Sequence, residues 1–256
     1  MSKSTLQTVE RAFHILEILS EEANGLTATE IEKKLQLNKS TVHRLLMTLL
    51  SKGFIEKREN TNAYIIGLKM VELSSIRLNN IELKTEAVPY LRELSYKLNQ
   101  PVQLATYRDG DAVFIEKIEP INSIRVYSQI GKRIPAYCCS VGKAMLVQWS
   151  DDTIREMLQD TSWIAYTPTT LQNIDSLIKE VNEARQTGFA IDNEEHEEGI
   201  FCIAAPIYDY RGDIIAAIST AGTNKEFLVD HDAPIIREVK DTAAHISARM
   251  GYHLQN

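Results

Sequence analysis

The sequence predicts an α+β protein with three parts: a helical N-terminal domain that carries a β-hairpin, a linker helix, and a larger domain built on an antiparallel sheet flanked by helices. Amphipathic helical patterns followed by a hairpin pattern fill residues 1–67. A further helical pattern covers residues 68–99. Beyond it, paired strand patterns alternate with helical patterns, which is typical of one antiparallel sheet with helices on its faces. We therefore expect a winged helix-turn-helix domain at 1–67, a linker helix at 68–85 and a second domain at 86–256.

The first two helices are indicated by apolar spacing and by a capping signal. Apolar residues three and four positions apart define one face of a helix over residues 5–19, and these are Leu6, Val9, Phe13, Leu16 and Leu19. A polar run from Glu21 to Gly25 ends this helix. Thr27 and Glu30 have the spacing of a capping box, which predicts the start of a second, short helix.

The third helix, at residues 39–52, has the clearest pattern in the chain. Asn38 precedes it and is a favourable N-terminal cap. One face carries Val42, Leu45, Leu46, Leu49 and Leu50, and the other carries Ser40, His43, Arg44, Met47, Thr48 and Ser51. Gly53 ends the helix. Strand patterns at 54–58 and 63–66 follow on either side of a turn-rich tip, so the order of elements is that of a winged helix-turn-helix.

This N-terminal domain predicts DNA binding. A recognition helix buries one face and presents a short polar, basic face to the major groove. Hydroxyl groups near a helix N-terminus suit phosphates, and an arginine suits a guanine edge or a phosphate. The predicted contacts are Lys39, Ser40, Thr41, His43 and Arg44 in the helix, and Lys57, Arg58, Asn62 and Tyr64 in the wing. Two alternatives stay open: a helical bundle with a solvated polar face, and a winged helix that contacts proteins.

The charge distribution agrees with DNA binding although the chain is acidic. The net charge of the whole chain is −7. Residues 1–67 hold nine Lys and Arg against eight Glu, a net charge of +1. Within residues 38–58, five basic residues stand against Glu56 alone. Because charges are screened over about 10 Å in salt, a local basic surface attracts phosphates even on an acidic protein.

The second domain mixes strand and helix patterns. Strands are expected at residues 102–107, 112–118, 124–128, 200–208 and 213–221, and helices at 140–149, 151–159, 174–187 and 226–250. Turn residues at 108–111 and at 209–212 join the first and the last strand pairs into hairpins. Pro89 predicts a break in the helical pattern of residues 68–99, because proline removes a helical hydrogen bond.

Composition argues against several classes of protein. No apolar run approaches the roughly 18 residues of a membrane span, and the N-terminus lacks the apolar core of a secretion signal, so we expect a cytoplasmic protein without a membrane partner. Cys138 and Cys139 are adjacent, which is too close for a relaxed disulfide, and no CxxC or HExxH motif is present. A hydrolase built on Asp192, His196 and Cys202 is disfavoured, because the thiol lies in an apolar strand pattern. We expect no metal, no cofactor and no catalysis.

Motifs in both domains resemble the IclR family of bacterial regulators. The recognition-helix region, residues 35–46, matches the family's pattern. Further matches are Gly131-x-x-x-Pro135, Ser140–Ala144, Gly188–Glu195 and Gly199–Ile207, of which the last two are highly specific. The resemblance covers essentially the full chain. Within the family, residues 124–133 and 246–253 are most similar to repressors of pectin catabolism that respond to 2-keto-3-deoxygluconate.

The resemblance implies that the second domain is GAF-like and binds a small keto acid or sugar acid as effector. The implied effector-binding residues are Ser140, Val141, Gly142, Asp192, Cys202, Ser219 and Ala221. Residues 140–142 open a predicted helix, whose backbone N–H groups suit a carboxylate, and Lys143 is close in sequence. Ala221 stands where the family often has a second serine, so one polar contact is missing. Further candidates for contacts with a sugar acid are Arg125, Tyr127 and Ser128.

Each effector residue also has a purely structural interpretation. Cys202 suits an apolar core, Asp192 a solvated loop, and Ser140 a helix cap, while Lys143 suits a solvent-exposed position. The resemblance further implies a homodimer or homotetramer that binds double-stranded DNA at an inverted repeat, since twofold protein symmetry requires two half-sites. We expect a repressor, with an activator of the same family as one alternative. A small-molecule sensor that acts through protein contacts is the other.

Overall fold

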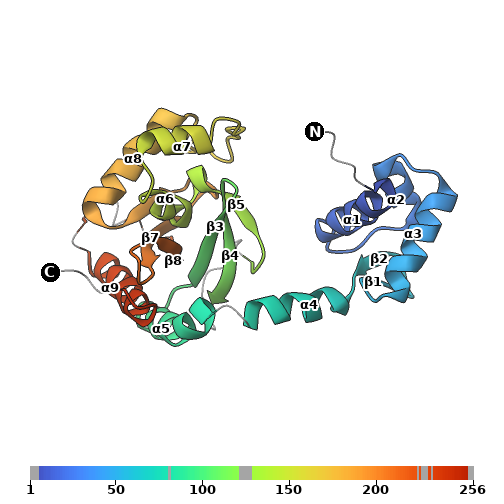
Figure 1. Cartoon of the computed structure of the whole chain (residues 1–256), viewed down its shortest axis with the longest axis horizontal. Helices are drawn as coiled ribbons and strands as arrows, with labels where there is room; N and C mark the ends of the chain where they lie inside the picture. The colour runs from blue at the N-terminus through green and yellow to red at the C-terminus, as the bar shows by residue number, and fades with distance from the viewer. Residues whose placement is uncertain are drawn as a thin grey trace. The chain divides into compact units, whose positions relative to one another are not determined.

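The computed structural model describes residues 6–79, 82–120, 129–223, 225, 230, 231 and 233–252. The chain forms two compact units that divide between Asn80 and Ile81 (Figure 1). Outside the described residues lie the strand expected at 124–128 with Arg125, Tyr127 and Ser128, the start of the helix expected at 226–250, and His253. The domain boundaries given above stay a prediction.

The first unit is a winged helix-turn-helix followed by one more helix. Its elements are α1 (Gln7–Ser20), α2 (Ala28–Leu35), α3 (Lys39–Ser51), β1 (Ile55–Lys57), β2 (Tyr64–Ile66) and α4 (Leu68–Asn79). Both predicted caps are present. Thr27 and Glu30 form the reciprocal bonds of a capping box, and Asn38 Oδ1 accepts a hydrogen bond from the N–H of Thr41 at 2.9 Å. Since β1 and β2 also pair antiparallel, the predicted fold of this unit is confirmed.

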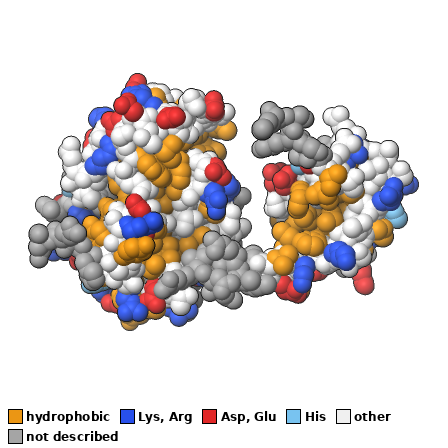
Figure 2. Space-filling model, in the orientation of Figure 1, with side chains coloured by type: hydrophobic (Ala, Val, Ile, Leu, Met, Phe, Trp, Pro, Cys, Tyr) orange, Lys and Arg blue, Asp and Glu red, His pale blue; other side chains and the backbone are white. Residues whose placement is uncertain are grey.

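The helix α1 buries one side and leaves an apolar stripe exposed. Ile15 and Leu19 are buried in a cluster with the apolar face of α3. By contrast, Leu6, Val9 and Phe13 are 74%, 46% and 58% exposed. Figure 2 shows hydrophobic side chains gathered on the surface of this unit. The spacing of these residues therefore marks a helix face that its own unit does not bury.

The second unit is built on an antiparallel sheet. Its elements are α5 (Glu82–Leu98), β3 (Val102–Arg108), β4 (Asp111–Ile118), β5 (Arg133–Pro135), the 3₁₀-helix η1 (Ala136–Cys138), α6 (Ser140–Leu146), α7 (Asp151–Met157), α8 (Ile174–Thr187), β6 (Ala190–Asn193), β7 (Phe201–Tyr208), β8 (Ile214–Gly222) and α9 (Pro234–Arg249). Within the described residues, six strands form the sheet in the order β5-β4-β3-β8-β7-β6, and each neighbouring pair is antiparallel. The predicted α+β architecture is confirmed.

Helices cover both faces of this sheet (Figure 1). Successive side chains of a strand point to opposite faces. Ala204 and Ala217 pack in one apolar cluster with residues of α6 and α8. Their neighbours Ile203 and Ile218 are also buried and point to the opposite face, where α9 packs against β7 and β8 and contacts α5. The face covered by α6 holds the cavity described below. No helix in the described part of the chain is long and apolar enough to cross a membrane.

The prediction of a break near Pro89 is wrong, because α5 runs across this proline. Four side chains of one face of α5 are 6% exposed or less, and these are Leu83, Ala87, Leu91 and Leu94. A proline inside a helix costs about 3 kcal/mol. Burying several apolar side chains contributes roughly 1.5–3 kcal/mol each, which offsets that cost.

Two short strands, β5 and β6, were not predicted from the sequence. β5 has three residues and pairs with β4, and β6 has four and pairs with β7. Segments of this length are too short to show a clear alternation of apolar and polar residues. Their pairing is fixed by the neighbouring strands, so the short segments alone do not reveal it. β6 matters most here, because it carries Asp192.

Candidate functional site

The exposed face of α3 gathers the predicted recognition residues. Lys39, Ser40, His43 and Arg44 are exposed, and Thr41 is half-buried. The opposite face holds the helix in place through the buried side chains of Val42, Leu45, Leu46 and Leu49. Arg44 therefore lies on a helix that the apolar core of the first unit holds in place. The N-terminal turn of α3 is further ordered by Asn38, whose Oδ1 also accepts a hydrogen bond from the Ser40 hydroxyl at 2.9 Å.

The wing carries three of its four predicted contact residues on the surface. Lys57, Arg58 and Asn62 are exposed. Asn62 has a φ of +54°, the left-handed conformation that a tight hairpin tip requires and that asparagine tolerates. The guanidinium of Arg58 lies 3.4 Å from the carbonyl oxygen of Asn24, which tethers this side chain toward the α1–α2 turn. The wing therefore presents two exposed cations, Lys57 and Arg58, in the same unit as α3.

Tyr64 is the predicted wing contact that the structure buries. Its side chain is only 5% exposed and belongs to the apolar core of the first unit. Its backbone N–H donates to the carbonyl oxygen of Leu26 at 2.7 Å. The ammonium of Lys57 lies 5.7 Å from the centre of its ring. The physical reason is that the side chain of Tyr64 points into the core of the first unit. Its ring lies close to Lys57 and is not exposed for a contact with DNA.

A cavity in the second unit lies between the start of α6 and the sheet. Its interatomic space, including open solvent at its mouth, is about 430 Å³, so the enclosed part of the cavity is small. Its lining includes the predicted residues Ser140, Val141, Asp192, Cys202 and Ser219. It also includes residues that the sequence analysis did not assign to it, namely Gln103, Phe114, Ile134, Cys139, His196, Glu197 and Ile200. Segments far apart in the sequence therefore converge on one site.

Strand pairing explains this convergence. Asp192 of β6 is paired with Cys202 of β7, and Cys202 is paired with Ala221 of β8. In a neighbouring row, Ser219 of β8 is paired with Gln103 of β3. Directly paired residues point to the same face of a sheet. The two rows therefore place the polar side chains of three strands beneath the start of α6.

Two predicted effector residues are not part of the cavity lining. A Cβ atom on Gly142 would lie 2.4 Å from Cα of Ala136, so this glycine allows α6 to approach η1. Ala221 is 1% exposed and lies in the same cross-strand row as Asp192, but its methyl group does not reach the cavity surface. Gly142 and Ala221 therefore contribute to the packing around the cavity and not to its surface.

Asp192 is a buried carboxyl group at the cavity wall. It is 5% exposed, and its Oδ1 accepts a hydrogen bond from the backbone N–H of Glu195 at 2.8 Å. Burial, together with the neighbouring carboxylate of Glu195, raises the pKa of Asp192 to about 7. The interpretation of Asp192 as part of a solvated loop is therefore wrong, and its surroundings favour the protonated carboxyl group.

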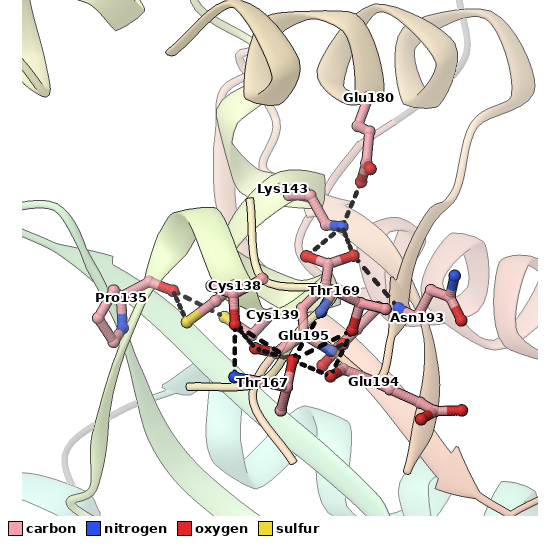
Figure 3. Close-up of polar contacts among 12 residues, drawn as sticks. Pro135, Cys138, Cys139, Lys143, Thr167, Thr169, Glu180, Asn193, Glu194 and Glu195 are labelled. Carbon is pink, nitrogen blue, oxygen red and sulfur yellow. Dashed lines mark hydrogen bonds and ion pairs between the residues drawn. The ribbon is translucent and has the colours of Figure 1, made fainter. Parts of the chain in front are cut away.

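Lys143 is neither solvent-exposed nor directed into the cavity. Its side chain is fully buried and forms an ion pair with Glu195 at 2.7 Å and another with Glu180 (Figure 3). Burial alone would lower the pKa of Lys143, but these two carboxylates raise it above its usual value. Lys143 was expected close to an effector carboxylate, but its ammonium contacts the carboxylates of Glu180 and Glu195 of the protein itself.

The cavity residues that were not predicted differ in how clearly the sequence pattern indicated a buried polar role. Gln103 is a lone polar residue in an apolar strand pattern and is 2% exposed, so a buried polar role was visible in the sequence. His196 lies against Tyr166, with ring centres 5.0 Å apart. Burial lowers the pKa of His196 to about 4, and Lys132 adds to this, so the imidazole is neutral at pH 7. Phe114 and Ile200 gave no signal beyond ordinary core patterns.

The cysteines do not have the properties of nucleophiles. Cys138 and Cys139 are buried and Cys202 is half-buried at the cavity wall. Burial raises the pKa of each of these thiols well above its ordinary value, which disfavours the reactive thiolate. No group of three or more His, Cys, Asp or Glu side chains in the described parts of the chain has the arrangement of a metal site. The arrangement suits binding of a small polar molecule better than covalent chemistry.

Comparison with known proteins gives matches over nearly the whole chain. The model of the IclR helix-turn-helix domain matches residues 8–59, and that of the bacterial transcriptional regulator IclR C-terminal domain matches residues 76–248. Three regulators of Escherichia coli K12 are similar. XynR is 31% identical, covering 96% of this chain and 98% of XynR. KdgR is 31% identical, covering 97% and 94%, and the repressor AllR is 30% identical, covering 96% and 90%. The crystal structure of Thermotoga maritima IclR superposes with a TM-score of 0.78 at 28% identity, covering 96% of this chain and 99% of that one.

Proposed function

Because this chain belongs to the IclR family of bacterial transcriptional regulators, we propose that it is a repressor whose affinity for an operator is controlled by a small keto acid or sugar acid. The observation that carries the proposal is the combination of an exposed recognition face on α3 with a polar cavity beneath α6. A similar protein is named a repressor, which supports this direction of control over activation. A regulator of this kind acts on the chromosome, so a cytoplasmic location is part of the proposal.

We propose that α3 enters the major groove and that the wing contacts the phosphate backbone. Arg44 is the residue best placed for a base edge, and Lys39, Ser40, Thr41 and His43 surround it. In the wing, Lys57, Arg58 and Asn62 are the proposed contacts, while Tyr64 serves as support. Phosphate contacts position the protein and base contacts give specificity.

The operator is proposed to be an inverted repeat read by a homodimer or by a homotetramer. Support comes from apolar surface that the first unit leaves exposed. In α1, Phe13 is 58% exposed, and in α4, Leu68, Val71 and Leu73 are 68%, 59% and 44% exposed. Large apolar side chains left exposed on two helices suit an interaction site. A second copy of the chain is a self-complementary partner that would bring two recognition helices onto two half-sites.

The proposed effector is a small hydroxylated acid, and 2-keto-3-deoxygluconate is the first compound to test. Asp192, Ser140 and Ser219 offer polar contacts to hydroxyl or carbonyl oxygens. No Lys or Arg is among the described residues that line the cavity, so the backbone N–H groups of Ser140 and Val141, which do line it, are proposed to hold the carboxylate. The resemblance of residues 246–253 suggests this compound, while the similar identities of XynR, KdgR and AllR leave other acids to compare.

Effector and DNA act on each other only if the effector binds the DNA-competent state and the released state with different affinities. A coupling free energy of about 1–3 kcal/mol changes operator affinity roughly 5- to 150-fold. We propose that residues 68–85, the predicted linker, transmit this difference, because every effect of one unit on the other along the chain passes through them.

The salt dependence of binding distinguishes DNA recognition from a sensor that contacts a protein. A protein that makes 6–10 phosphate contacts loses roughly 10³- to 10⁵-fold in affinity between 50 and 200 mM salt, because the release of counterions from DNA on binding becomes less favourable as the salt concentration rises. We expect a loss of this size in a fluorescence-anisotropy titration with labelled operator DNA. Affinity for DNA that hardly changes with salt would favour the protein-contact alternative.

A further inference from the structure

A buried ion pair joins α6 to the loop between β6 and β7 (Figure 3). The ammonium of Lys143 donates to Oε1 and Oε2 of Glu195 at 2.7 and 2.9 Å. Lys143 is 0% exposed and Glu195 is 2% exposed. A second carboxylate, that of Glu180 on α8, contacts the same ammonium. Three elements of the unit therefore meet at one buried cation.

Glu195 connects this cation to the cavity. Its backbone N–H donates to Oδ1 of Asp192 at 2.8 Å. Its side-chain Oε1 accepts a hydrogen bond from the backbone N–H of Asn193 at 3.2 Å. The next residue in the chain, His196, lines the cavity, as does Glu197. One residue thus orients the Asp192 carboxyl group with its backbone and fixes the loop with its side chain.

Threonine hydroxyls hold the same loop at its backbone carbonyls. Thr170 Oγ1 donates to the carbonyl oxygen of Glu195 at 2.6 Å, and Thr167 Oγ1 donates to that of Glu194 at 2.6 Å. These bonds involve backbone oxygens, and Lys143 holds the side chain of Glu195. The ion pair therefore contributes a constraint that the threonines do not supply.

We propose that Lys143 and Glu195 are positioning residues of the effector site, whose ion pair holds residues 193–200 so that Asp192 and His196 face the cavity. The ammonium of Lys143 serves this loop and does not bind the effector's carboxylate. The inference rests on the proposed function for the identity of the effector. A buried ion pair carries a large desolvation cost and often adds little stability, so fixing one loop conformation is a physical role that suits it.

The test uses the full chain and a variant that avoids an unpaired buried charge. Lys143→Met alone would leave Glu195 buried without its cation, whereas the double variant Lys143→Met/Glu195→Met removes both charges and keeps the volume. We expect hydrogen–deuterium exchange of the amides in residues 193–200 to rise about 10- to 100-fold, because charge-assisted hydrogen bonds are lost, while exchange in β7 and β8 stays unchanged. We expect the Kd for 2-keto-3-deoxygluconate, measured by calorimetry, to rise by a similar factor with operator affinity unchanged.

Two further variants calibrate this result. Glu195→Gln keeps an acceptor for the Asn193 N–H and for Lys143 but removes the charge of Glu195, so its loop exchange should lie between that of the wild type and that of the double variant. Lys240→Met removes a lysine from the surface of α9, where its ammonium donates to the Thr187 carbonyl oxygen, and should change neither readout. Unchanged exchange of residues 193–200 in the double variant overturns the positioning role, and so does raised exchange with unchanged affinity. A wild-type chain that does not bind the compound contradicts the proposed effector alone, because the exchange measurement still decides the role of the ion pair.

Discussion

Ser219 donates its hydroxyl hydrogen to Oε1 of Gln103 at 2.8 Å, across the pairing of β8 with β3. Both side chains are 2% exposed, and both line the cavity. A buried polar pair at a cavity wall is ordered before a ligand arrives. The floor of the proposed effector site is therefore preorganised by the sheet, while its rim is formed by the loop that follows β6.

Removing this hydroxyl should weaken effector binding. Ser219→Ala removes this bond and takes one hydrogen-bonding group from the cavity wall. A single hydrogen bond contributes about 0.5–1.5 kcal/mol, so we expect the affinity for 2-keto-3-deoxygluconate, measured by calorimetry, to fall roughly 2- to 13-fold. Thr220→Val is the matched control, because it removes a buried hydroxyl of the same strand that donates to the Pro101 carbonyl oxygen. Equal losses in both variants would argue for a general effect on the sheet.

Arg44→Ala should weaken operator binding without unfolding the protein. Arg44 is exposed on α3, so truncation removes a contact with DNA and no core packing. A good arginine contact with a base contributes about 1–3 kcal/mol of discrimination, so we expect a roughly 5- to 150-fold loss that depends on the DNA sequence. Lys179→Ala removes an exposed cation from α8 of the second unit and should leave the titration unchanged. An Arg44→Ala chain with wild-type affinity would remove Arg44 from the reading face.

Asp192→Asn should change how stability depends on pH. The pKa of Asp192 is raised by burial and by Glu195 from 3.8 to about 7. A raised pKa means that the folded state favours the protonated form. The contribution of Asp192 to stability is therefore complete below about pH 3.8 and is lost as the pH rises to about 7. Asparagine does not titrate, so the melting temperature of the variant should rise relative to that of the wild type over this pH range. Above it, the difference between the two melting temperatures should stay constant.

Calorimetric melting of both chains across this pH range checks the prediction. Asp160→Asn is the control, since it makes the same replacement at an exposed aspartate. A pH-independent difference for Asp192→Asn would show that folding does not change the pKa of Asp192, against the burial argument.

Phe13→Glu should disrupt assembly. Phe13 is 58% exposed in the apolar stripe of α1, so a carboxylate there costs little in the folded unit but opposes burial in an interface. We expect sedimentation velocity to show a smaller species and operator affinity to fall, because two half-sites need two chains. Tyr96→Glu changes a more exposed aromatic residue, 89% exposed on α5, and should keep the wild-type mass. The same mass for Phe13→Glu would place the interface elsewhere.

Local signals made the first unit predictable from its sequence. The capping box at Thr27 and the cap at Asn38 are contacts within four residues, so their spacing is visible in the chain itself. The inward direction of Tyr64 was not visible, because it depends on the pairing of β2 with the distant Leu26. The stripe on α1 was recognised as a face, but spacing alone does not tell whether a face is buried within one chain.

The effector cavity could be predicted only in part, for a similar reason. Asp192, Cys202 and Ser219 were found through family motifs, and strand pairing then brought them together. The role of Lys143 depends on Glu195 and Glu180, which lie 52 and 37 positions away in the sequence. No local pattern links residues at such distances, so the ion pair is a property of the fold and not of any motif.

The measurement that tests the central claim most directly is an electrophoretic mobility shift with the DNA upstream of this protein's own gene. It compares the wild type with Asp192→Ala, each with and without 2-keto-3-deoxygluconate. We predict that the wild-type complex forms and is released by the compound, while the Asp192→Ala complex forms and persists. A wild-type complex that the compound leaves intact would contradict control by this effector, and the absence of any complex would contradict a DNA-binding regulator.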